Sequence, residues 1–150
     1  MRCPIAISTV AALLAFGTGP AHAQRSHVGF HGGYNFDLED ALVGAQMHIP
    51  VARLVEFYPS FDYYFTGAGG ASLVGISVDL KLRFPAYPWE LYLGGGVNFL
   101  RSSGNTQSAP DIFAGLETRI GNSHPYFEVR ALLHDPSLVQ LAAGINFTLF

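Results

Sequence analysis

Cysteine, lysine and long apolar runs are all scarce in this chain. The one cysteine, Cys3, lies close to the start, so the rest of the chain holds no disulfide and no cysteine-based metal site. Lys and Arg together number 8 against 11 Asp and Glu, which excludes the clustered positive charge of a nucleic-acid-binding protein. After residue 24 no apolar run approaches the roughly 20 residues that a membrane-spanning helix needs. Folding must therefore depend on burial and backbone pairing.

Residues 1–23 have the features of a secretory signal peptide. Arg2 supplies a positive charge, residues 5–16 are apolar, and Ala21-His22-Ala23 is a small-x-small cleavage site. The alternative is an uncleaved anchor, although the apolar stretch is short for a membrane span. Cleavage leaves residues 24–150, enough for one domain but not two.

The composition of the chain is unusual for a protein surrounded by water. Charged residues make up 13% and hydrophobic residues 49%, and 17 residues are glycine. A soluble domain usually carries about 25% charged residues. Something other than water is expected to contact much of the surface.

Alternation of apolar and polar residues recurs along the chain, separated by short stretches rich in Gly, Pro, Asn, Asp and Ser. This period of two is typical of strands with two unlike faces, and no segment has the periodicity of an amphipathic helix. The eight predicted strands are 27–37, 41–51, 54–65, 72–84, 89–100, 111–120, 125–134 and 137–149.

The two faces of these strands differ sharply in charge. One face holds 45 positions without a charged residue, and the other combines many glycines with ten ionic side chains. The ten ionic residues are Glu56, Asp62, Asp79, Lys81, Arg83, Glu90, Glu117, Arg119, Glu128 and Arg130.

The run Gly94-Gly95-Gly96 interrupts a strand and precedes no helix. It therefore indicates close packing in the wall rather than a phosphate-binding loop, and we expect no cofactor.

Two barrels fit this alternation. A lipocalin-like periplasmic binding protein points its apolar face inward, whereas a membrane barrel points it at lipid. An eight-stranded barrel is only wide enough to be filled by side chains, and the bulky apolar face would overfill it. Aromatic residues also gather near the strand ends, as the two girdles of a transmembrane barrel do. The girdle residues are Tyr34, Phe36, Tyr63, Phe65, Phe84, Trp89 and Phe99. We therefore predict an all-β, eight-stranded antiparallel up-and-down transmembrane β-barrel.

Three segments carry a resemblance to a known family. Residues 28–36 (VGFHGGYNF), residues 58–65 (YPSFDYYF) and the terminal Phe150 resemble small outer-membrane β-barrel proteins of the OmpA-like and OmpX-like kind. The resemblance implies a place in the bacterial outer membrane, contact with its lipid and lipopolysaccharide, and folding by the barrel-assembly machinery with Phe150 as the assembly signal. In that family the terminal aromatic residue lies on the apolar face of the last strand. Here Ile145, Phe147 and Leu149 occupy that face, so the alternation places Phe150 on the opposite face. We expect a monomer.

The resemblance also implies periplasmic termini, which leaves residues 101–110 as one long, flexible outer loop. Inside the barrel, four acids and four bases lie on neighbouring strands. Buried charges must be paired, so this pattern predicts a salt-bridge plug, with a water-filled, ion-selective path as the alternative. Asp62 and Asp79 have no base in register. The interior charge network consists of Glu56, Lys81, Arg83, Glu90, Glu117, Arg119, Glu128 and Arg130.

A few residues have the types needed for catalysis or metal binding. Some small outer-membrane barrels act on lipid A, and His134, Asp135 and Ser137 have the residue types of a deacylase near the expected outer rim. The same Asp-Pro-Ser context is typical of a tight turn, which we favour. No two of His27, His31, His48 and His124 have the spacing of metal ligands, so we expect no metal. The sequence therefore favours a non-enzymatic barrel with a role in envelope structure or surface interaction; a lipid A-modifying enzyme and a lipocalin-like binding protein are the alternatives.

Overall fold

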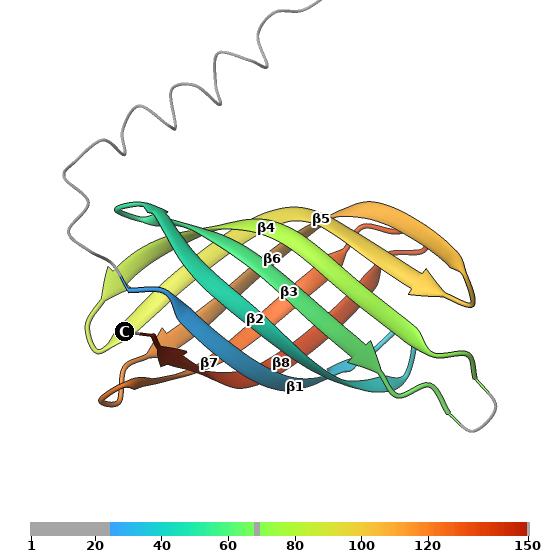
Figure 1. The fold of residues 1–150 in the computed structure, drawn as a ribbon, viewed down its shortest axis with the longest axis horizontal. Helices are drawn as coiled ribbons and strands as arrows, with labels where there is room; N and C mark the ends of the chain where they lie inside the picture. The colour runs from blue at the N-terminus through green and yellow to red at the C-terminus, as the bar shows by residue number, and fades with distance from the viewer. Residues whose placement is uncertain (1–24, 68–69, 150) are drawn as a thin grey trace, which may run out of the picture.

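A computed structural model describes residues 25–67 and 70–149 of the chain, and in it eight strands form one closed barrel (Figure 1). Every strand pairs antiparallel with its neighbours in sequence, and β1 pairs with β8 to close the wall. The strands are β1 (His27–Asn35), β2 (Asp40–Ala52), β3 (Val55–Tyr64), β4 (Leu73–Ala86), β5 (Trp89–Ser102), β6 (Asn105–Thr118), β7 (Ser123–Leu132) and β8 (Leu138–Thr148).

In the part of the chain that is described, no helix has the length and apolar character needed to cross a membrane.

The eight predicted strands are confirmed, and most of their ends fall within two residues of the expected positions. The beginning of β6 is the exception, because the predicted loop 101–110 is wrong. Pairing between β5 and β6 continues to Ser102↔Asn105, and Ser103 and Gly104 alone make the turn. Both turn residues have positive φ (47° and 85°), as a two-residue hairpin turn of type I′ requires. Residues 105–108 are exposed on both faces, so they show no alternation.

Pro59 lies within β3 without shifting the register of the wall. Gln46↔Ser60 on one side of it and Ile49↔Phe57 on the other belong to the same alignment. The one irregularity between β2 and β3 lies between Pro50 and Ala52, next to the turn.

The outer face of the wall is apolar and the inner face is polar. Leu80 and Ile112 are 53% and 55% exposed on the outside, whereas their neighbours Lys81 and Asp111 are each 1% exposed inside. The fold therefore has the transmembrane arrangement, and the lipocalin-like alternative, with the apolar face inward, is excluded.

Glycines give the interior room for its large side chains. A Cβ on Gly94 would lie 2.4 Å from Cζ of Phe113, and one on Gly96 would lie 2.5 Å from Oδ1 of Asp79. The missing side chains leave room for side chains from neighbouring strands to lie against the backbone of these glycines, in agreement with the close packing expected at residues 94–96.

Candidate functional site in the barrel interior

Two groups of charged side chains occupy the interior. The Lys81 network lies toward the terminal end of the barrel, where Ser26 and Leu149 meet, and the Arg130 network lies farther from that end. The Lys81 network consists of His48, Glu56, Lys81, Arg83, Glu90, Glu117 and His124. The Arg130 network consists of Tyr58, Asp79, Tyr92, Asp111, Glu128 and Arg130.

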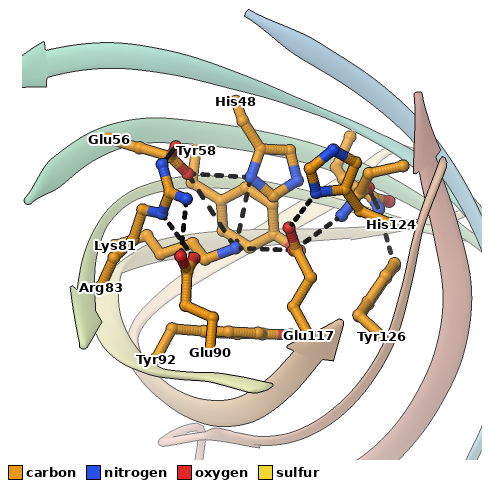
Figure 2. Close-up of polar contacts among 12 residues, drawn as sticks. His48, Glu56, Tyr58, Lys81, Arg83, Glu90, Tyr92, Glu117, His124 and Tyr126 are labelled. Atoms are coloured by element: carbon orange, nitrogen blue, oxygen red, sulfur yellow. Dashed lines mark hydrogen bonds and ion pairs between the residues drawn. The ribbon is translucent and has the colours of Figure 1, made fainter. Parts of the chain in front are cut away.

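Lys81 lies at the centre of the first network (Figure 2). Its Nζ is 3.3 Å from Oε2 of Glu117, 3.3 Å from Nδ1 of His48 and 3.9 Å from Oε2 of Glu56. The ammonium also lies 3.8 Å from the ring centroid of Tyr92, a cation–π contact. With a side chain only 1% exposed, Lys81 is held by partners from four other strands.

Arg83 and His124 extend the Lys81 network across the barrel. The guanidinium of Arg83 donates to both carboxylate oxygens of Glu90, at 2.5 and 2.6 Å, and to Oε1 of Glu56 at 2.8 Å. Two-point contact of this kind is among the stronger ion pairs in proteins. On the opposite side, Nδ1 of His124 is 3.1 Å from Oε1 of Glu117.

Arg130 organises the second network. Its Nη1 donates to Asp79 and Asp111 at 2.6 and 2.5 Å, and Nη2 donates to Glu128 at 3.1 Å. The hydroxyls of Tyr58 and Tyr92 both donate to Glu128 at 3.1 Å. One arginine thus faces three carboxylates.

His31, Gln46 and Asn146 connect Asp62 to the Lys81 network. Nε2 of His31 is 2.6 Å from Asp62, and its Nδ1 is 2.5 Å from Oε1 of Gln46. The amide of Gln46 donates to Asn146, and the amide of Asn146 donates to Glu117. Sequence reasoning missed Gln46 and Asn146 because only ionic residues were followed along the inner face.

Seven of the eight predicted network residues lie in these two groups, and the interior placement of Arg119 is wrong. β6 ends at Thr118, so Arg119 lies beyond the strand, is exposed, and donates to the carbonyl oxygen of Gly121 at 3.3 Å. Asp62 and Asp79 have no base in register on a neighbouring strand, as predicted, yet each meets a base elsewhere. His31 meets Asp62 and Arg130 meets Asp79, because inward side chains reach across the barrel as well as to the next strand.

The predicted girdle residues are exposed on the outer face. Edge-to-face pairs join Tyr34 to Phe36 and Tyr63 to Phe65 near the far end, with ring centroids 5.5 and 5.4 Å apart. Phe84 and Trp89 lie near the β4–β5 turn at the terminal end, and Phe99 lies toward the far end on β5. Phe150 falls outside the described residues.

Three histidines lie closer together than the sequence indicated. His27 is paired in register with His48, and its ring is 6.0 Å from that of His48 and 4.6 Å from that of His124. The spacing of these histidines along the sequence did not predict this group. Within residues 25–67 and 70–149, no three or more His, Cys, Asp or Glu side chains form an arrangement that would hold a metal ion.

His134 and Ser137 lie in the β7–β8 turn. The Ser137 hydroxyl donates to the backbone carbonyl of His134 at 3.4 Å, and Nε2 of the His134 ring is 3.2 Å from Oδ1 of Asn98. The hydroxyl and the ring therefore engage different partners, as turn residues do, whereas a nucleophile bonds to its base.

Two cavities mark how far the interior is filled. A cavity of about 10 Å³ beside Arg130, also lined by Ser60 and Asp62, has room for about one water molecule. A wider hollow of about 180 Å³ opens at the terminal end, beside Arg83, Glu90 and Trp89.

The likeness of this chain to known proteins is one of structure. No family model matches the chain, and no curated protein matches it in sequence. Among solved structures, a de novo designed transmembrane β-barrel aligns with a TM-score of 0.67 and 20% identity, over 83% of this chain and 95% of the other. The N-terminal β-barrel domain of Pseudomonas aeruginosa OprF aligns with a TM-score of 0.65 and 16% identity, over 84% and 98% of the two chains.

This is the fold of a small outer-membrane β-barrel. Ail, the attachment invasion locus protein of Yersinia pestis, has it too, with a TM-score of 0.58, 14% identity and coverage of 83% and 97%. The OmpA-like and OmpX-like architecture expected from the sequence is confirmed. At these identities the small-barrel likeness establishes the fold alone, so the role of the chain has to be argued from its own residues.

Proposed function

We propose that this chain is a non-enzymatic outer-membrane barrel whose interior is closed by ion pairs and whose main role is in envelope structure. The burial of Lys81 among acids, a histidine and an aromatic ring carries the proposal. An ion moving through the barrel would have to displace this ammonium from its partners, and uncompensated buried charge costs several kcal/mol per ion.

The proposal includes a route to the membrane and a set of partners. Residues 1–23 direct export as a signal peptide, and the mature chain begins at Gln24. The barrel-assembly machinery inserts the chain, with Phe150 as part of its signal. Lipid and lipopolysaccharide then surround a monomer, in keeping with the uncharged outer wall.

The closed interior predicts the electrical behaviour of the purified protein. In planar bilayers the wild type should show no steady large channel. Lys81→Ala removes the central ammonium and its stem, so the fraction of time in a conducting state should rise several-fold. Leu80→Ala is the matched control, because the adjacent side chain faces outward. Steady large channels in the wild type would contradict closure.

The absence of catalysis predicts unchanged lipid A. Mass spectra of lipid A from cells that overproduce the wild type should equal those from cells that overproduce His134→Ala/Ser137→Ala, since the Ser137 hydroxyl bonds to a backbone carbonyl and not to the ring. A mass change that appears with the wild type and disappears in the double variant would establish the enzyme instead.

Surface interaction is the second candidate, and the tip of the β5–β6 hairpin favours it. β6 pairs with β5 from Asn105 onward, but its pairs with β7 begin only at Asp111. The strand edge at residues 105–109 is therefore open at the far end, and an open edge can pair with another chain. Replacing residues 101–106 by Asn-Gly should leave folding intact and abolish any adhesion of cells that display the barrel; adhesion unaffected by the change would dismiss this candidate.

A further inference from the structure

Asp79 and Asp111 are two buried carboxyl groups that contact the same nitrogen atom. They lie on β4 and β6, on either side of Gly96 in one cross-strand row, Asp79↔Gly96↔Asp111. Each uses Oδ2 to accept from Nη1 of Arg130, at 2.6 and 2.5 Å. Their side chains have no exposed surface, so water does not solvate either group.

The second oxygen of each carboxyl group has no donor. Oδ1 of Asp79 and Oδ1 of Asp111 are both buried without a hydrogen-bond partner. Oδ1 of Asp79 lies over Gly96, where a Cβ would be only 2.5 Å away, and Gly96 is the residue between the two aspartates. Because both Oδ2 atoms lie within 2.6 Å of the same Nη1 atom, the two carboxyl groups are close together. Two ionised carboxylates at this separation would place acceptor beside acceptor.

The charges around the pair sharpen this conflict. Arg130 is the base bonded to Asp79 and Asp111, and it also donates to Glu128, so one positive charge meets three acids. Tyr58 contributes a hydroxyl, which is directed to Glu128. Asp62 and Tyr64 on β3 add no cation, and His31 is engaged by Asp62. Like charges that lie this close together and are buried away from water cannot all stay ionised.

We propose that Asp79 and Asp111 form a proton-binding site, in which one proton is shared between the two carboxyl groups at neutral pH. The proton supplies the donor that the two Oδ1 atoms lack and reduces the acidic charge on Arg130 from three to two. Glu128 differs from the two aspartates, because two tyrosine hydroxyls and the guanidinium of Arg130 donate to its oxygens. The site does not depend on whether the barrel conducts ions.

Infrared spectroscopy of the full-length mature barrel in lipid vesicles tests the site directly. With aspartate labelled by ¹³C at the side-chain carboxyl, the wild type at neutral pH should show the C=O stretching band of a protonated aspartic acid. The band should vanish in Asp79→Asn and in Asp111→Asn, because each variant leaves a single ionised aspartate beside Arg130. Glu128→Gln, the matched carboxyl-to-amide control, should keep the band.

Thermal melting gives a second, independent result. An asparagine NH₂ replaces the shared proton as donor, so Asp79→Asn and Asp111→Asn should melt at or above the wild-type temperature. Glu128→Gln loses an ionised acceptor and should melt roughly 5–10 °C lower. No aspartic acid band in the wild type would overturn the proposal even if the variants fail to fold. A melting temperature that rises with Na⁺ or K⁺ concentration at fixed pH, in a protein that lacks the aspartic acid band, would show that a metal cation occupies the site in place of the proton.

Discussion

Replacing Arg130 by alanine should lower the free energy of unfolding of the barrel by several kcal/mol. The side chain is 3% exposed, and its guanidinium is the cation that Asp79, Asp111 and Glu128 share. Removing it leaves these acids buried without a counter-charge, which costs about 3–5 kcal/mol. Urea titration of the refolded protein in vesicles, followed by the heat-modifiable band on a detergent gel, measures the free energy of unfolding.

Arg119→Ala is the control for that experiment. Arg119 is exposed and bonds to a backbone carbonyl, so its removal should change the free energy of unfolding by no more than about 0.5 kcal/mol. Equal losses for the two arginine variants would show that the Arg130 network contributes little to folding. Arg130→Lys should lie between them, because an ammonium keeps the charge but not the planar contacts to several carboxylates.

A charge on the outer wall should also be strongly destabilising, although less so than the loss of Arg130. Ile112 is 55% exposed in the middle of the apolar band, in a cross-strand row with Leu80 and Gly95. Ile112→Arg places a guanidinium near the centre of the bilayer, where an arginine costs about 2–4 kcal/mol in a transmembrane barrel. The same urea titration detects this loss.

An arginine placed near the end of a strand separates the cost of a charge in the bilayer centre from the cost of losing an apolar side chain. Val51 is 58% exposed, but it lies one residue from the end of β2. Val51→Arg lets the guanidinium reach the membrane interface, so its cost should fall to about 0–1 kcal/mol. A similar cost at both positions would speak against a bilayer around the wall.

Much of the fold could be predicted because a barrel wall is a single layer. Each residue faces either lipid or the interior, so alternation along one strand reveals both faces without knowledge of the neighbouring strands. The outward position of Leu80 and the inward position of Lys81 follow from this rule alone. The rule failed at residues 105–108, because a hairpin tip that extends beyond the wall has water on both faces and shows no alternation.

Partners inside the barrel were harder to predict than faces. Pairing along the chain indicates which residues are neighbours on adjacent strands, such as Glu56 and Lys81. It does not indicate which side chains meet across the lumen, such as Arg130 with Asp79, or His27 with His124. These contacts depend on strand tilt and stagger, which the sequence does not show directly.

The central claim is that the apolar face of the wall contacts lipid hydrocarbon. Spin labels on single cysteines test it most directly, because the chain has no cysteine after Cys3. The labels are placed at the outward positions of β4, which are Val74, Ile76, Val78, Leu80, Leu82 and Phe84. In vesicles, collisions with oxygen should peak at Val78 and Leu80, while collisions with a water-soluble nickel chelate should be frequent only toward the two ends. Frequent nickel collisions at all six positions would show a wall that faces water and would contradict the account.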